Sequence, residues 1–411
     1  MRSINKYLQR YAEAEVTSLS QFPTSFRFSN TLVIPAYQED DAFFQRLLKS
    51  SLSQCPVLYI LVINQPDSET DSTLQFNLSQ TISSSGKLVW QHLNLSLVQP
   101  DKISASILLV DRFSTNQTID NKQGVGLARK IGSDLATALI HSKQIDCPWI
   151  CSSDADAHLP DNYFSVLASV VENTSAIIYD FNHTDVKNDL SDATQLYEQA
   201  LRYYVAGLQW AGSSYGFHTI GSTLCFRYDY YVLVRGFPKR SAGEDFYLLN
   251  KLAKLAPVRT LNAATGNNAT IKIDARVSHR VPFGTGPAVS KILTLNNPSQ
   301  DYLYYDPQLF VELSRSLKAL NKLWLYLDDT ESWFQTLSEP ARYGFEKLPF
   351  HKLIKHLQSH GVDKQGCDSQ IFQWFDAFRT LKFIHYLQEK YHPPIPLQKA
   401  IFNAPFEVKP E

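Results

Sequence analysis

Two aspartates separated by a single residue, Asp154 and Asp156, follow the mostly apolar run 148–153. If that run is a strand, its carboxylates emerge at the carboxyl end of a sheet, where open α/β folds bind their ligands. Carboxylate oxygens at this place would hold a divalent ion such as Mg²⁺ or Mn²⁺, and such ions commonly bind diphosphates. The Asp-x-Asp pattern alone is common by chance, so this interpretation needs support from the rest of the chain.

A second acidic pair, Glu244 and Asp245, stands after Gly243 at the start of an apolar helix, 88 positions beyond Asp156 (244 − 156). Transfer from a sugar diphosphate needs acidic residues in two roles. One binds the ion that neutralises the leaving diphosphate, and the other removes a proton from the acceptor hydroxyl. Acidic residues are also favoured at helix starts by the helix dipole, and this structural explanation is the stronger one for the pair in isolation.

Alternating strands and helices must position these carboxylates. Runs that are apolar on both faces, typical of buried parallel strands, alternate with helical patterns, and the helix that begins at Gly124 carries an apolar face. A polar helix and a serine-rich loop lie between the second and third of these runs. The pattern predicts an α/β fold with a doubly wound, mostly parallel sheet flanked by helices. The expected strands are residues 31–37, 57–63, 107–110, 148–153 and 176–181.

Composition and charge argue against several classes of protein. The 411 residues include 39 basic and 40 acidic side chains without a charged tail, so nucleic acid is not an expected partner. Five scattered cysteines lack the paired spacing of a zinc site. The N-terminus lacks the apolar stretch of a signal peptide, and no run of about 18 apolar residues marks a transmembrane segment. We expect a cytoplasmic protein, and peripheral association with a membrane stays open.

The acidic pairs belong to a longer, ordered set of six segments. These are Val33–Glu39, Gly124–Gly132, Ser153–Pro160, Gly221-Ser222 followed by Arg227, Arg235–Phe237 and Gly243–Asp245. Their residue types and order resemble the landmarks of family 2 glycosyltransferases over about residues 30 to 255. The resemblance implies a GT-A fold, a nucleotide-sugar donor, a Mg²⁺ or Mn²⁺ ion and, usually, inversion at the anomeric carbon.

The resemblance also assigns roles to residues at matching positions. It implies that Asp154 and Asp156 bind the metal ion and the ribose-diphosphate, with Asp156 as the direct ligand. It implies that Asp245 is the catalytic base and that Glu244 orients the acceptor hydroxyls. His279 could complete the metal shell, although a loop histidine is as often structural. The remaining assignments are Pro35, Ala36, Tyr37, Glu39, Asn64, Arg129 and Ala155 for the nucleotide sugar, and Gly221, Arg276 and Arg280 for the acceptor.

The same resemblance suggests how the chain is divided. We expect residues 1–27 to form a helical leader and residues 28–290 to form the GT-A catalytic domain. Within that domain, residues 28–185 would be the nucleotide-sugar-binding half and residues 186–290 the acceptor half. Residues 291–411 form a helical C-terminal extension rich in aromatic side chains. This extension could bind the acceptor, support the core or mediate homo-oligomer formation, and the sequence does not choose among these roles.

Two departures from the family pattern affect what the resemblance implies. The acidic turn that usually follows the second strand is replaced by Ile63–Ser68, so Asn64, Asp67 or Asp111 would read the base, and the donor could be UDP- or GDP-linked. No membrane helices follow the catalytic region, and the tryptophan-bearing acceptor motif of processive polysaccharide synthases is absent. A processive polymerase is therefore not expected.

Several functions stay open within and beyond this family. The leading one is inverting transfer, with Asp245 as base, to a small-molecule or lipid-linked acceptor. The segment Lys272–Arg280 also resembles the ending of retaining synthases that glycosylate glycerate or phosphoglycerate, in which Arg276 and Arg280 would bind the anionic acceptor. A nucleotidyltransferase would carry a glycine-rich basic loop after the first strand, which residues 35–39 lack. An inactive GT-A binding module would be expected to lose its acidic pairs, and both are present.

Overall fold

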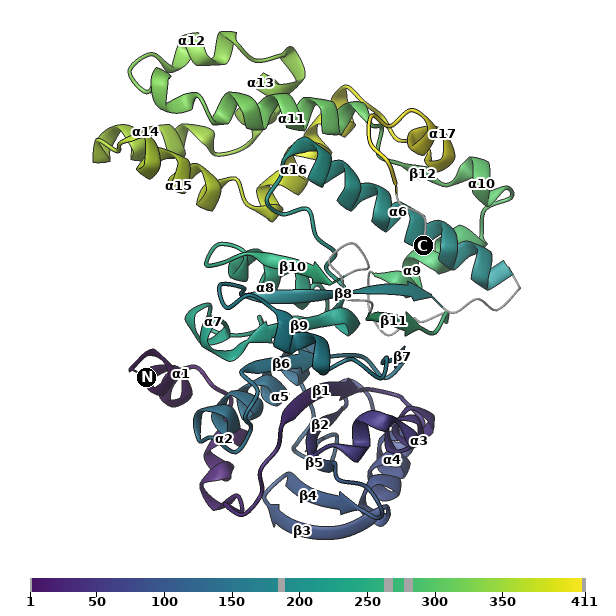
Figure 1. Cartoon of the computed structure of the whole chain (residues 1–411). Coiled ribbons are helices and arrows are strands. Elements are labelled where there is room, and N and C mark those ends of the chain that lie inside the picture. Colours follow the sequence, from purple (N-terminus) through teal and green to yellow (C-terminus); the bar gives the residue numbers. More distant parts are fainter. Residues whose placement is uncertain (1, 184–188, 262–268, 277–283, 409–411) are drawn as a thin grey trace. The chain divides into compact units, whose positions relative to one another are not determined.

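The computed structural model describes residues 2–183, 189–261, 269–276 and 284–408. Contacts divide the chain into two compact units, whose elements are labelled in Figure 1. Unit 1 consists of residues 1–184 and 219–284, and unit 2 consists of residues 185–218 and 285–411. By these contacts the expected acceptor half, residues 186–290, is shared between the two units, and the functional division of the chain stays a prediction.

A parallel core forms the centre of the unit 1 sheet, in the order β5-β2-β1-β6. The side chains of β1 and β2 are buried nearly throughout. Runs of Val, Ile and Leu suit such strands because helices cover both faces of the sheet. The strands are β1 (Asn30–Ala36), β2 (Val57–Asn64), β5 (Ser106–Arg112) and β6 (Trp149–Ser152).

Further strands extend this core on both sides (Figure 1). A hairpin of β3 and β4 adds to β5, at a place where the sequence predicts only a helix and a loop. On the other side, β9 lies antiparallel between β6 and β8. The result is a mixed sheet with a parallel core, which confirms the predicted α/β fold. The added strands are β3 (Gly86–His92), β4 (Leu95–Pro100), β7 (Ala157–His158), β8 (Ala176–His183), β9 (Leu224–Arg227), β10 (Val258–Leu261) and β11 (Thr270–Ile273).

Helix α5 (Gly124–His141) packs on β1 and β2 and is buried along most of its length. A Cβ at Gly132 would lie 2.4 Å from a methyl group of Val33, so glycine at this position lets the helix approach the sheet closely. Further helices of unit 1 are α1 (Arg2–Arg10), α2 (Glu15–Ser18), α3 (Ala42–Lys49), α4 (Thr73–Ser84), α7 (Tyr228–Leu233) and α8 (Glu244–Leu252).

A buried polar cluster ties the N-terminal helices to α5. Asp134 is fully buried, and its carboxylate accepts hydrogen bonds from the hydroxyls of Tyr7 at 2.5 Å and Tyr231 at 2.9 Å. The Lys130 ammonium and the backbone N–H of Glu13 each donate to it at 2.8 Å. Burial raises the pKa of Asp134, although the donors around it oppose this shift. The N-terminal leader is thus bonded to the core of unit 1.

Replacing Asp134 by alanine is expected to lower the free energy of unfolding by about 3–5 kcal/mol, because the buried Lys130 ammonium would lose its nearest carboxylate and the Tyr7 and Tyr231 hydroxyls would lose their acceptor. Urea unfolding followed by circular dichroism measures this loss. The matched control is Asp229→Ala, which removes a partly exposed carboxylate paired with Arg227 and should cost about 1 kcal/mol or less. Equal losses in the two variants would show that the buried cluster does not stabilise unit 1.

Unit 2 is built of helices around an aromatic core. Trp333, Phe345, Phe350 and Phe383 are buried together, and the rings of Trp333 and Phe350 stack with centroids 5.0 Å apart. None of the helices in the described ranges has both the length and the apolarity needed to cross a membrane. The elements are α6 (Asp189–Ala211), α9 (Thr285–Leu293), α10 (Pro298–Asp301), β12 (Leu303–Tyr304), α11 (Gln308–Leu320), α12 (Thr330–Gln335), α13 (Glu339–Lys347), α14 (Phe350–His360), α15 (Lys364–Trp374), α16 (Ala377–Lys390), β13 (Ile395–Pro396) and α17 (Leu397–Phe402).

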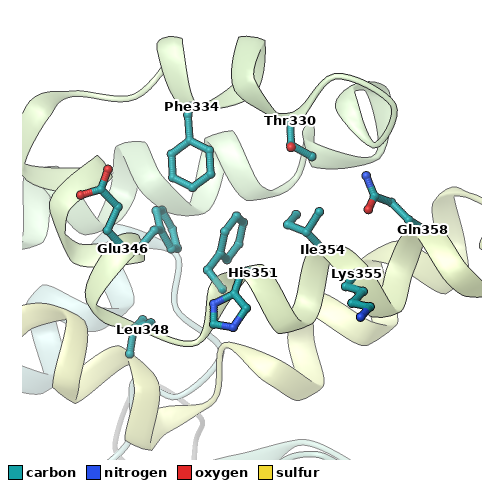
Figure 2. Close-up of a pocket in the computed structure, with 10 residues that line it drawn as sticks. Thr330, Phe334, Glu346, Leu348, His351, Ile354, Lys355 and Gln358 are labelled. Atoms are coloured by element: carbon teal, nitrogen blue, oxygen red, sulfur yellow. The ribbon is translucent and has the colours of Figure 1, made fainter.

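Unit 2 contains a pocket of about 370 Å³ lined by residues of α12, α13 and α14. Figure 2 shows Phe334 and Ile354 pointing into this pocket from opposite sides. Glu346, His351 and Lys355 are exposed lining residues with polar side chains. The pocket thus combines an apolar interior with charged and polar groups that solvent reaches.

Candidate functional site

Both aspartates of the Asp-x-Asp pair lie at the carboxyl edge of the parallel core. Strand β6 ends at Ser152, and Asp154 and Asp156 follow it beside the parallel strand β1. Because parallel strands end at the same edge of a sheet, Glu39 after β1 and Asn64 at the end of β2 belong to this edge as well. The fold therefore gathers several residues that the sequence assigns to the nucleotide sugar.

Arg129 of α5 joins the two acidic pairs. Its Nη2 donates to Asp154 Oδ1 at 2.6 Å, and its Nε donates to Glu244 Oε1 at 2.8 Å. Its Nη1 donates to the Ser152 hydroxyl at 2.7 Å, and the side chain is only 3% exposed. Burial disfavours the charge, but the carboxylates of Asp154 and Glu244 outweigh this effect and raise the pKa of Arg129. Arg129, assigned to the nucleotide sugar, is thus bonded to protein groups on three sides, and its contact with a nucleotide stays a prediction.

Two residues that the sequence assigns to the acceptor side contact Arg129. Glu244 is 4% exposed and its Oε1 accepts from Arg129, and its role in orienting acceptor hydroxyls stays a prediction. Gly221, assigned to the acceptor, lies against the same guanidinium, and a Cβ at this position would be 2.3 Å from Arg129 Nη2. Glycine at position 221 is therefore explained by the space that Arg129 needs.

Arg276 is a second guanidinium at this edge. Its Nη1 and Nη2 donate to the two carboxylate oxygens of Glu39, both at 2.9 Å, in a bidentate fork. Its Nε lies 2.9 Å from Asp156 Oδ2. The side chain of Arg276 is 33% exposed, so solvent reaches this ion pair. Each aspartate of the Asp-x-Asp pair is thus held by a different arginine, Asp154 by Arg129 and Asp156 by Arg276.

Asp245, the predicted base, has a pKa raised to about 7. Burial is the main cause, and the neighbouring carboxylates of Glu244 and Asp154 add to it. The backbone N–H of Phe246 and the charge of Arg129 oppose the shift. A carboxyl group with a pKa near 7 accepts a proton at neutral pH and releases it again, which is the behaviour that a general base requires.

Among the three candidates for reading the base, Asn64 has an unused acceptor. Asp111 Oδ1 accepts from two backbone N–H groups of its own turn at 3.0 and 2.9 Å, and Asp67 Oδ1 accepts from the N–H of Asn121 at 3.1 Å. Asn64 is 4% exposed, and its Oδ1 has no hydrogen-bond partner among the residues that the structure describes. A buried acceptor without a donor is costly, and an N–H group of a bound base would satisfy it.

Three further residues assigned to the nucleotide sugar lie at the end of β1 or just beyond it. Pro35 and Ala36 are buried and paired with β2. Tyr37 is partly exposed and donates its hydroxyl to Glu69 at 3.1 Å. These residues lie at the carboxyl edge of the sheet, and their contact with a nucleotide stays a prediction.

The described residues supply carboxylates for a divalent ion without a complete protein shell. Over the described ranges, no three His, Cys, Asp or Glu side chains come together as a metal site. The predicted ligand His279 lies outside the described residues, as does Arg280. Asp154 and Asp156 offer hard oxygens, and sites for Mg²⁺ commonly use one or two carboxylates plus the phosphates of the substrate. The two aspartates therefore fit an ion that binds together with a diphosphate.

Sequence reasoning missed two supports of this site. Arg46 of α3 donates to the carbonyl oxygen of Ala155 at 2.6 Å, which holds the turn between the two aspartates. Ser153 donates its hydroxyl to the carbonyl oxygen of Ser222 at 3.0 Å, which fixes the start of the same turn. No sequence signal marks Arg46, whereas Ser152 and Ser153, two small polar residues ending an apolar strand, could have indicated partners for buried polar groups.

Comparisons with known proteins give only distant structural likeness. No protein-family model matches the chain, and no curated protein matches it. Among solved structures, S. aureus TarS 1–349 in complex with UDP-GlcNAc is 12% identical over 84% of this chain and 91% of that chain, with a TM-score of 0.36. Glucosyl-3-phosphoglycerate synthase from Mycobacterium tuberculosis, in complex with Mn²⁺, UDP and glucosyl-3-phosphoglycerate, is 10% identical over 70% of this chain and 86% of that chain, with a TM-score of 0.34. At these scores, a function has to be inferred from the chain's own geometry.

Proposed function

We propose that this chain is a metal-dependent glycosyltransferase that uses a nucleotide-diphosphate sugar. The observation that carries the proposal is that one buried arginine, Arg129, joins the two acidic pairs at the carboxyl edge of a parallel sheet. One pair would bind the donor diphosphate through an ion, and the other would serve the acceptor hydroxyl. Sugar transfer requires both functions at one place, because the reacting groups must be held within contact distance of each other.

At the donor position, Asp154 and Asp156 would hold Mg²⁺ or Mn²⁺ together with oxygens of the diphosphate. When bound, the ion would neutralise charge on the leaving diphosphate. The charge of the site fits such an ion. Among the described residues, the guanidiniums of Arg129 and Arg276 interact with five carboxylates, so carboxylates outnumber these two cations; the carboxylates are Glu39, Asp154, Asp156, Glu244 and Asp245.

At the acceptor position, Asp245 would remove the proton from the attacking hydroxyl while that oxygen bonds to the anomeric carbon. A pKa of about 7 lets Asp245 be a carboxylate at neutral pH and still be basic enough to take the proton. Glu244 adds to this raised pKa through its buried charge, and Arg129 fixes the position of Glu244. A base at this position favours inversion, in which the acceptor displaces the diphosphate in one step.

The retaining alternative gains no added support from the described residues. It calls for a cation that binds the carboxylate or phosphate of an anionic acceptor. In the structure Arg276, assigned to that role, is bonded to Glu39 and Asp156, and Arg280 lies outside the described residues. We therefore favour the inverting scheme with a small-molecule or lipid-linked acceptor.

Thermal unfolding with Mn²⁺ and a nucleoside diphosphate tests the proposal. UDP is tried first, because the two solved structures named above contain UDP or UDP-GlcNAc, and GDP follows. We expect the melting temperature to rise only when ion and nucleotide are both present. At a nucleotide concentration a hundredfold above its Kd, binding should add about 2.7 kcal/mol to the free energy of unfolding. Asp156→Ala should abolish the rise, because it removes the direct ligand of the ion.

The control for this experiment is Asp229→Ala, which removes a carboxylate paired with Arg227 at the end of β9 away from the site. Its response to Mn²⁺ and nucleotide should equal that of the wild type. A wild-type protein that shows no metal-dependent response to either nucleotide would contradict the proposed function.

A further inference from the structure

We propose that Arg276 acts as an internal cation at the metal position, and that it leaves Asp156 only when an ion binds together with a nucleoside diphosphate. This inference rests on the proposed function and deepens it, because it states what controls metal binding at that site. The Nε of Arg276 lies 2.9 Å from Asp156 Oδ2. A guanidinium and a divalent ion repel each other, so an ion binds Asp156 more tightly once Arg276 has moved away from that carboxylate oxygen.

Arg276 is anchored on Glu39, so only one of its contacts has to break. Its Nη1 and Nη2 donate to the two oxygens of Glu39, both at 2.9 Å. These two bonds would keep the guanidinium at the site while its Nε leaves Asp156. The freed edge would then face the diphosphate, and guanidiniums bind phosphate oxygens through such edges. Arg276 thereby exchanges a carboxylate for a phosphate, and the ion takes the carboxylate.

Arg129 is more buried than Arg276 and could not leave its aspartate as easily. It is 3% exposed and bonded on three sides, so Asp154, whose own side chain is 33% exposed, keeps its arginine partner. Arg276 is 33% exposed and its contact with Asp156, itself 18% exposed, is open to solvent. An ion pair that solvent reaches costs little to separate. Arg276 is therefore the arginine that can leave its aspartate when an ion binds to the pair.

This exchange makes the binding of ion and nucleotide cooperative. An ion alone has to displace a guanidinium that receives no new partner. An ion that arrives with a diphosphate supplies phosphate oxygens to that guanidinium. Each ligand then raises the affinity for the other by the same factor, as linkage requires. In a variant without the Arg276 guanidinium, the ion alone should bind more tightly, and nucleotide should raise the affinity for the ion by a smaller factor.

The test is Mn²⁺ binding to Arg276→Gln, measured by electron paramagnetic resonance of the free ion, first with Mn²⁺ alone and then with UDP or GDP added. The readout is a Kd and needs no turnover. We expect Mn²⁺ alone to bind the variant about tenfold more tightly than the wild type, and the nucleotide-dependent factor to fall by about as much. Arg276→Lys keeps the charge but lacks the fork that anchors the side chain on Glu39. Its Kd for Mn²⁺ should therefore lie between those of the wild type and Arg276→Gln.

The matched control is Arg227→Gln, which removes a partly exposed arginine paired with Asp229 at the other end of β6 and β9. It should bind Mn²⁺ like the wild type, which shows that lowering the net positive charge elsewhere has no such effect. Ligand-free thermal unfolding checks that each variant folds, and Arg276→Lys decides the comparison if Arg276→Gln does not fold.

Two outcomes overturn the inference in different ways. If Arg276→Gln binds Mn²⁺ no more tightly than the wild type while the wild type responds to Mn²⁺ with nucleotide, the inference is wrong and the proposed function stands. If the wild type itself shows no Mn²⁺ binding that depends on nucleotide, both are wrong. Tighter Mn²⁺ binding with a reduced nucleotide-dependent factor supports Arg276 as the internal cation.

Discussion

The variant Asp245→Asn is expected to lower kcat by about 10²–10⁴-fold and to leave nucleotide binding unchanged. The amide has the shape of the carboxylate but cannot accept the proton of the acceptor hydroxyl. In the proposed scheme the donor binds through Asp154 and Asp156, which follow β6 and which the substitution leaves in place. Release of the nucleoside diphosphate from a sugar donor measures kcat, and calorimetric titration with Mn²⁺ and nucleotide measures binding.

The pH dependence of kcat/KM gives an independent check on Asp245, because this constant reports groups of the free enzyme. The pKa of Asp245 is raised to about 7, so the group is protonated below that pH and is a carboxylate above it. The wild-type kcat/KM should therefore rise with pH up to about 7 and then level off, and Asp245→Asn should lack this rise. Asp229→Asn serves as a control with an unchanged profile. A fully active Asp245→Asn variant would remove Asp245 from the role of base.

The parallel core could be predicted because its strands are buried on both faces. β1 and β2 consist almost entirely of apolar residues. A continuous apolar run is visible in the sequence and is typical of a strand covered on both faces. The β3–β4 hairpin escaped prediction because β3 is an edge strand with several exposed side chains, among them Lys87, Leu88 and Gln91. An edge strand has only one neighbour and needs no continuous apolar run, so its pattern is weak.

The positions of the acidic residues in the fold could be predicted from sequence, and their pairing with two arginines could not. Asp154 and Asp156 follow a strand, and Asp245 lies in the first turn of a helix, which are positions that local patterns reveal. Arg276, by contrast, forms its fork with Glu39 across 237 positions. Such a pairing depends on the order of strands in the sheet, and a single sequence does not state that order. A motif marked Arg129 but did not show that its guanidinium bridges both acidic pairs.

Replacing Arg129 by methionine is expected to lower the free energy of unfolding by about 3–5 kcal/mol and to abolish transfer. The side chains of Arg129 and Glu244 are 3% and 6% exposed, so the substitution leaves the Glu244 carboxylate buried without its counter-charge. Asp154 loses the same partner and is no longer held in its place beside Asp156. Urea unfolding measures the first effect, and release of nucleoside diphosphate from a sugar donor measures the second.

A second substitution separates the structural part of this loss from the functional part. In the Arg129→Met background, Glu244→Gln removes the buried charge that methionine leaves unpaired, so we expect most of the lost stability to return. Transfer should stay absent, because Asp154 still lacks its anchor and Asp245 loses a neighbouring charge that raises its pKa. If stability and transfer return together, Arg129 only compensates for the charge of Glu244. If Arg129→Met alone is as stable and active as the wild type, the joined acidic pairs are not the basis of the site, and the proposed function loses the observation that carries it.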